Sequence, residues 1–143
     1  MRTPFLPLLP CALVAAALPA AAATLVVRAE GIGSTEGELK VAVCDQGFDE
    51  SGCRLGSSRA PTAAVEEFTF HDLAPGRYAV AVYHDVNGNG RLDTVPLGLP
   101  TEPYGFSNDV GRFRPPSFTA ALVGVGEGST TVVVDVRPLL GRR

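Results

Sequence analysis

The sequence predicts an all-β protein: a single antiparallel β-sandwich of six to eight strands that carries one long inserted loop. Its 143 residues are enough for one domain. The 16 glycines and 12 prolines disfavour long helices, because both residue types are costly in a helix interior. Beyond the N-terminal segment, apolar residues alternate with polar ones or form short runs between turns, and they do not follow the spacing of a helix face.

Short apolar segments justify the strands of this sandwich one by one. The segment 38–44 alternates, with Leu39, Val41 and Val43 on one face. The segment 77–84 is apolar on both faces, which is typical of a central strand covered on both sides. The expected strands are residues 24–30, 38–44, 65–70, 77–84 and 130–137, with a sixth at 117–123.

Residues 1–23 have the parts of a secretory signal peptide: Arg2, an apolar stretch over 5–18, and small residues at 20–23. The apolar stretch is shorter than the roughly 20 residues of a membrane span. We expect cleavage to leave residues 24–143 as one exported domain, periplasmic or extracellular, without a membrane span. This domain holds all 15 acidic and 11 of the 12 basic residues, so its net charge is −4.

Export determines how the cysteines are interpreted. In an oxidising compartment Cys44 and Cys53 are expected to form a disulfide, which stabilises a fold by about 2–3 kcal/mol for a loop of this length. A metal site would need two more soft ligands, and only His71 and His84 are available. A redox pair would more typically be spaced Cys-x-x-Cys.

The segment 85–116 has little strand pattern, and a loop of this length in a small domain is usually functional or held in place by something. Its first part resembles the front half of a calcium loop, with side-chain oxygens at alternate positions followed by Gly90 and a backbone carbonyl. The twelfth position is Pro96 instead of Glu, so a later acid must complete the site, and Glu102 and Asp109 are the candidates. The predicted Ca²⁺ ligands are Asp85, Asn87, Asn89, Arg91 (through its carbonyl), Asp93 and Glu102.

Two features qualify this calcium hypothesis. The run Asn-Gly-Asn-Gly is also suited to a tight turn without any metal, because these residues tolerate positive φ. Few carboxylates are certain ligands, so the expected affinity is that of extracellular calcium modules, roughly 10⁻⁴–10⁻³ M.

Two resemblances extend this interpretation. The run FHDLAPGRY (residues 70–78) resembles the Phe-x-x-Leu-x-Pro-Gly-x-Tyr signature of prealbumin-like β-sandwich modules, such as the carboxypeptidase regulatory domain, and implies the fold alone. The runs HDVNGNGRLDT (84–94), GLPTE (98–102) and YGFSN (104–108) resemble the exported bacterial family numbered 2141 among domains of unknown function. That resemblance implies a fold and export but no activity, and the cysteine pair is not regarded as a feature of the family.

The residues favour a binding protein over an enzyme. Hydrolysis needs a nucleophile, a base and an oxyanion site, and His71 and His84 are the only histidines. The Tyr-Arg-Gly-Ser motif of the transthyretin-like hydroxyisourate hydrolases is missing. The acidic charge argues against nucleic acid as a partner. We therefore expect a non-enzymatic, calcium-stabilised binding or accessory module of the cell envelope, whose partner is an envelope protein or a glycan. The alternatives are a purely structural envelope protein and, less favoured, a prealbumin-like hydrolase.

Overall fold

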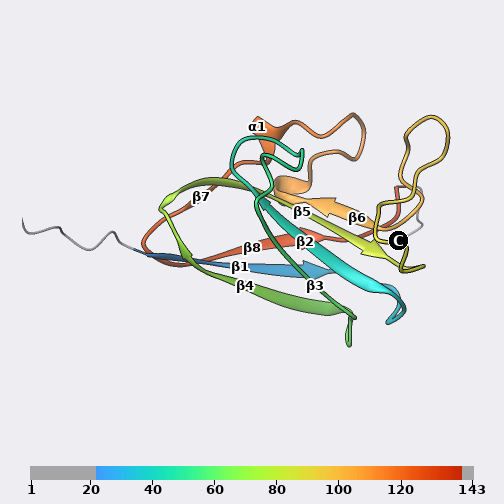
Figure 1. The fold of residues 1–143 in the computed structure, drawn as a ribbon, viewed down its shortest axis with the longest axis horizontal. Coiled ribbons are helices and arrows are strands. Elements are labelled where there is room, and N and C mark those ends of the chain that lie inside the picture. The colour runs from blue at the N-terminus through green and yellow to red at the C-terminus, as the bar shows by residue number, and fades with distance from the viewer. Residues whose placement is uncertain (1–21, 140–143) are drawn as a thin grey trace, which may run out of the picture.

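Eight strands and two short helices form the part of the chain that the computed structural model describes, residues 22–139 (Figure 1). In chain order they are β1 (Ala23–Glu30), β2 (Glu38–Cys44), β3 (Leu55–Arg59), β4 (Val65–Leu73), β5 (Gly76–Asp85), β6 (Tyr104–Phe106), the 3₁₀ helix η1 (Ser107–Asp109), α1 (Phe118–Ala121), β7 (Val123–Val125) and β8 (Gly128–Asp135).

The strands lie in two sheets that face each other (Figure 1). One sheet has the order β4-β1-β8, and the other has the order β3-β2-β5-β6, with β7 paired to β5. The prediction of an all-β sandwich is confirmed. One pair departs from a purely antiparallel arrangement, because β1 and β8 run parallel from Ala23↔Gly128 to Glu30↔Asp135. These strands come from opposite ends of the described chain, so no tight hairpin forces them to be antiparallel.

The core lies between the two sheets and is built from alternate residues of the strands. In β1, Leu25, Val27 and Ala29 are fully buried while the residues between them are partly exposed. The same period of two places valines and leucines of β2, β5 and β8 inward. The predicted central position of 77–84 is confirmed, because β5 pairs with β2 on one side and with β6 and β7 on the other.

Several elements differ from the sequence expectation. Strand β3 was not predicted, because all five of its residues are exposed and it is held by backbone pairing with β2 at the edge of the sheet. Strand β6 lies within the long segment expected to have little strand pattern. The sixth expected strand, 117–123, is mostly helix α1, whose first turn is capped by the Ser117 hydroxyl as it accepts the N–H of Ala120.

The expected signal peptide lies almost wholly outside the described residues. Of residues 1–23, only the last two are described, and Ala23 is fully buried at the start of β1. Strand β1 therefore begins one residue before the expected boundary at residue 24.

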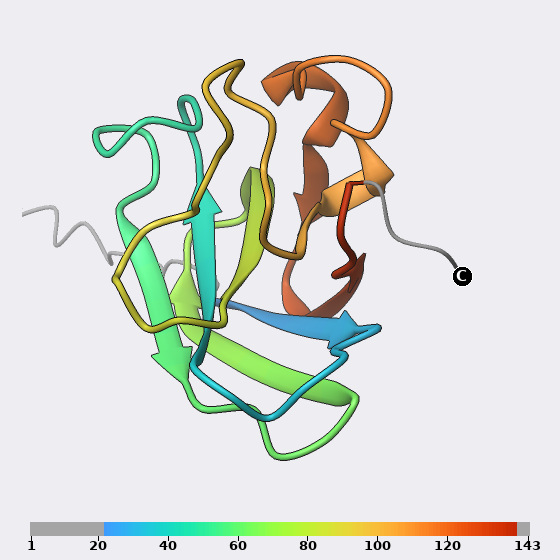
Figure 2. The same cartoon turned by 90° about the vertical axis from the view of Figure 1, so that its right-hand side faces the viewer.

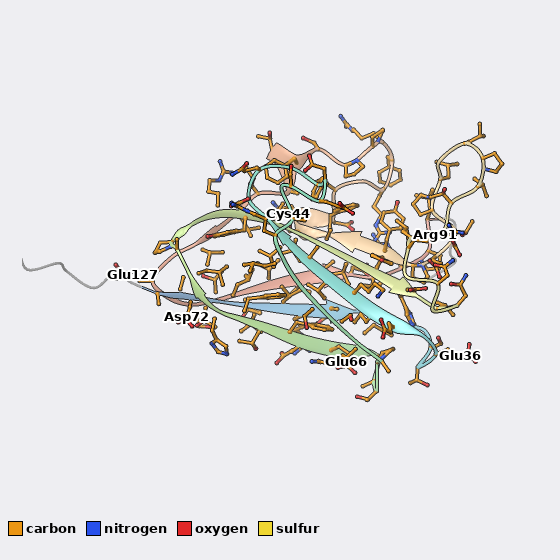
Figure 3. The ribbon with its side chains drawn as sticks, in the orientation of Figure 1. Glu36, Cys44, Glu66, Asp72, Arg91 and Glu127 are labelled. Atoms are coloured by element: carbon orange, nitrogen blue, oxygen red, sulfur yellow. A yellow bond between two sulfur atoms is a disulfide. The ribbon has the colours of Figure 1, made fainter. Side chains whose placement is uncertain are left out.

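The predicted disulfide is confirmed: Cys44, the last residue of β2, is bonded to Cys53 (Figure 3 labels Cys44). It closes the loop 45–52 at the end of the strand. Phe48 of this loop packs against Phe106 in a tilted arrangement and against Phe118 edge to face, with ring centroids 4.8 and 5.4 Å apart. The covalently closed loop therefore packs against β6 and α1.

Glu66 of β4 is a buried carboxylate that holds the β3–β4 connection. Its Oε1 accepts the N–H of Thr62 at 2.6 Å, and its Oε2 accepts the Arg59 guanidinium at 2.8 Å. These bonds, first the backbone N–H of Thr62 and then the Arg59 side chain, lower the pKa of Glu66 from 4.5 to about 2. A carboxyl with a depressed folded-state pKa stabilises the fold above its unfolded-state pKa, and this contribution is lost as the pH falls from 4.5 to about 2.

We predict that Glu66→Gln lowers the melting temperature at pH 7 by about 5 °C, because charge-assisted hydrogen bonds are lost. The difference from the wild type should shrink as the pH is lowered from 4.5 to 2. Thermal melts followed by circular dichroism across this range test it. Glu67→Gln, at the exposed neighbour, is the matched control and should change little. A difference that stays constant down to pH 2 would contradict the role given to Glu66.

Candidate functional site

The connection between β5 and β6, residues 86–103, projects from one end of the sandwich (Figure 1). Arg91 marks this connection in Figure 3, and Glu36 of the β1–β2 turn lies at the same end. All six predicted calcium ligands lie at the root or within this connection. We call residues 85–93 the Asx loop, after its alternating Asp and Asn side chains.

Asp85 organises the Asx loop from its root. It is the last residue of β5 and is 1% exposed. Its Oδ1 accepts the N–H of Asn89 at 3.0 Å and its Oδ2 accepts the N–H of Gly90 at 2.7 Å. Gly90 has a φ of 86°, which L-residues rarely adopt. The buried carboxylate thus bends the loop around itself.

The amides of Asn87 and Asn89 converge on the carboxylate of Asp93. Nδ2 of Asn87 donates to Oδ2 of Asp93 at 2.6 Å, and Nδ2 of Asn89 donates to both of its oxygens at 2.8 and 2.9 Å. Hydrogen bonds from Asn89, from Asn87 and then from Arg91 lower the pKa of Asp93. These three side chains therefore lie together, joined through the amide nitrogens of the two Asn residues.

The carbonyl oxygens of the two Asn side chains accept backbone N–H groups two residues further along the chain. Oδ1 of Asn87 accepts the N–H of Asn89, and Oδ1 of Asn89 accepts the N–H of Arg91, both at 3.1 Å. Each such oxygen has a second lone pair. The Asn side chains are therefore held in a defined orientation and keep acceptor capacity.

Glu102 ties the two ends of the Asx loop together. Its carboxylate is 7% exposed; Oε1 accepts the N–H of Val86 at 2.9 Å and Oε2 accepts the N–H of Asp93 at 3.0 Å. The other candidate acid, Asp109, lies elsewhere and pairs with Arg112 and Arg137. Of the two acids proposed to complete the site, Glu102 is the one that reaches the loop.

Two residues next to the site hold its root in place, and the pattern of ligands did not reveal their roles. His84 is fully buried, and its Nε2 lies 2.7 Å from the carbonyl oxygen of Glu36. Gly37 has a φ of 68°, and a Cβ there would collide with the carbonyl oxygens of Asp85 and Val86. The β1–β2 turn therefore closes directly on the root of the Asx loop. In the sequence, Gly37 directly before the Glu-Leu start of β2 was the signal that could have revealed this close contact.

Tyr104 anchors the long segment to the sandwich. Tyr104 is buried, and its hydroxyl donates to the carbonyl of Gly111 at 2.8 Å. The guanidinium of Arg112 lies over the Tyr104 ring, 4.9 Å from its centroid. The segment after η1 is thereby fastened to β6.

A cation at the Asx loop would have to take most of its ligands from neutral oxygens. Within residues 22–139, no three His, Cys, Asp or Glu side chains are grouped closely enough to hold a metal ion. An ion here would rely on the Asn oxygens and the Arg91 carbonyl beside the carboxylates. Such oxygens are typical ligands of Ca²⁺.

Comparison with known protein families gives a match over most of the chain. The sequence model of the family described as "Uncharacterized protein conserved in bacteria (DUF2141)" matches residues 27–133. No curated protein and no solved structure matches. No helix of the described segment is long and apolar enough to cross a membrane.

We predict that Glu102→Gln loosens the Asx loop without unfolding the sandwich. The variant has one acceptor oxygen for two N–H groups, so the amide of Val86 or Asp93 should exchange with solvent about tenfold faster, as expected when a hydrogen bond to a charged group is lost. Amide hydrogen exchange followed by NMR measures this. Asp109→Asn is the control that should leave both amides unchanged. Unaltered protection at both amides in Glu102→Gln would show that the carboxylate does not hold the loop.

Proposed function

The chain belongs to the bacterial family DUF2141, whose members are uncharacterised, and we propose that it is an exported, non-enzymatic binding module whose Asx loop binds Ca²⁺. In this proposal the ion stiffens the loop end of the sandwich, which meets a partner in the cell envelope. The observation that carries the proposal is the arrangement of Asp85, Glu102 and the alternating side-chain oxygens around one short loop.

Charge supports a divalent cation at this loop. Asp85, Asp93 and Glu102 contribute three carboxylates, and Arg91 is the cation bonded to one of them, at 3.4 Å from Asp93. Two of the three carboxylates are buried. A divalent cation would offset this excess negative charge, and Asx oxygens with a spare lone pair would supply the neutral ligands.

The arrangement of the histidines supports a role without catalysis. His84 is buried against the carbonyl of Glu36. His71 directly precedes Asp72, which lies at the opposite end of the sandwich from Arg91 (Figure 3). The two histidines therefore cannot share one site, and a hydrolase would have to work with a single one of them.

A second candidate function is a structural envelope protein that binds no ion. The observation that favours it is that every oxygen of Asp85 and Glu102 already accepts a backbone N–H. The Asx loop could then close without a cation. Calcium dependence of stability separates the two functions.

We predict that calcium raises the free energy of unfolding by about 1.4 kcal/mol when its concentration is ten times its Kd, because an ion that binds only the folded state stabilises it. Thermal melts in 10 mM calcium and in chelator, with calorimetry of calcium binding, measure this. Asp93→Asn should abolish the shift. Asp93 is partly exposed, so this variant should fold even where Asp85→Ala does not.

Asp109→Asn is the control for charge alone, and it should keep the calcium shift because Asp109 pairs with Arg112 and Arg137 away from the loop. Identical melting in calcium and chelator, together with no heat of binding at millimolar calcium, would reject the calcium proposal and favour the structural protein.

We also predict that the full chain, expressed in a bacterium, is found in the periplasmic fraction or the medium with Thr24 as its first residue. Subcellular fractionation and N-terminal sequencing test this. Replacing three leucines or valines of the apolar stretch 5–18 with Asp should retain the chain in the cytoplasm, because the apolar region of a signal peptide would be lost. Uncleaved wild-type chain in the cytoplasmic fraction would contradict export.

A further inference from the structure

A cavity of about 520 Å³ lies between the Asx-loop connection and the segment that follows η1. Residues 92–100 line one side of the cavity and residues 111–116 line another. Tyr104 and Phe106 of β6 also line it. The lining is dominated by Leu, Pro, Phe and Tyr side chains. Its volume and apolar lining are within the range of small-molecule sites, roughly 300–1,000 Å³.

Exposed apolar side chains gather at this cavity. Leu97 is 86% exposed and Leu99 is 46% exposed, and Phe113 is fully exposed. They are three of the seven large apolar side chains that are exposed among the described residues, and all three line the cavity. An apolar surface of this kind beside a hollow favours a ligand site over chance exposure.

Hydrogen bonds within the chain hold both walls of the cavity in place. Glu102 and Thr101 fasten the first wall to Asp93. In the second wall, the Arg112 side chain is 7% exposed and donates to the carbonyls of Tyr104 and Asp135 at 2.8 and 2.6 Å. The cavity is therefore largely formed before any ligand or ion binds.

One positive charge at the cavity is unbalanced. Asp109 pairs with Arg112 and Arg137, and Asp135 also pairs with Arg137. Arg114, which lines the cavity, makes no ion pair within residues 22–139. An apolar hollow with one free guanidinium matches a molecule that is apolar over most of its surface and negatively charged at one end.

We propose that this cavity binds a small amphipathic carboxylate, whose apolar body lies against Leu97, Leu99 and Phe113 and whose carboxylate pairs with Arg114. This gives the proposed binding module a ligand class, and it does not depend on calcium because hydrogen bonds within the protein hold the walls. A glycan suits the cavity poorly, since its hydroxyl groups would face an apolar lining without hydrogen-bond partners.

The proposal is tested by titrating the cleaved protein with decanoate in calcium-free buffer, using calorimetry and NMR chemical shifts. Decyltrimethylammonium has the same tail and the opposite charge, and acetate has the same head without the tail. We expect saturable one-site binding of decanoate, about tenfold weaker binding of the ammonium ion, and no binding of acetate at the same concentration. The amides of Gly98, Gly111 and Phe113 should shift on binding.

Two variants separate the parts of the ligand. Arg114→Glu should weaken decanoate binding about tenfold and favour decyltrimethylammonium, because the charge at the cavity is reversed. Phe113→Ser should weaken both decyl ligands about tenfold, because apolar contact is lost whatever the head group. Both residues are exposed, so neither change should affect folding.

Arg77→Glu and Val133→Ser are the matched controls, since both positions are exposed and neither lines the cavity. Decanoate binding that is absent, that maps to other amides, or that is unaffected by Arg114→Glu would overturn the proposal. The calcium experiment uses a different measurement, so either proposal can fail while the other stands.

Discussion

The end of the sandwich from which the β5–β6 connection projects depends on two hydrogen bonds accepted by the Glu102 carboxylate. One buried side chain accepts the N–H groups of Val86 and Asp93 and so closes the Asx loop from a position well after it. A buried carboxylate without partners would be strongly unfavourable, so the two donors stabilise the charge as well as the loop. The same contact sets the path of residues 92–100, which form one wall of the apolar cavity.

Two other parts of the chain support residues that line the cavity, Phe106 and Arg112. At the top of Figure 2 lie the β2–β3 connection (teal), the tip of the β5–β6 connection (yellow) and the segment after η1 (orange). Phe48 of the disulfide-closed loop packs against Phe106 and Phe118, and Arg112 connects the segment after η1 to β8. A surface supported from several directions is suited to present a preformed site, which lowers the entropic cost of binding.

Strands in which apolar and polar residues alternate could be predicted, because the side chains on the buried face of such a strand are apolar. Strand β3 could not, since its five exposed residues follow from backbone pairing with β2. Helix α1 was also missed, because its four residues have no helical period and depend on the Ser117 cap. The low pKa of Glu66 likewise arises from Thr62 and Arg59, which meet it only in the folded chain.

By itself the sequence determined the sandwich, from the alternation of apolar residues, and the disulfide, from the even pair of cysteines expected in an exported chain. It narrowed the completing acid to Glu102 or Asp109 without choosing between them. Only the tertiary structure decided that choice, placing Glu102 on the loop and Asp109 against Arg112 and Arg137. It also formed the cavity, whose lining comes from residues 92–100, β6 and 111–116. Long-range packing brings these segments together, and the spacing of residues within one segment does not predict such packing.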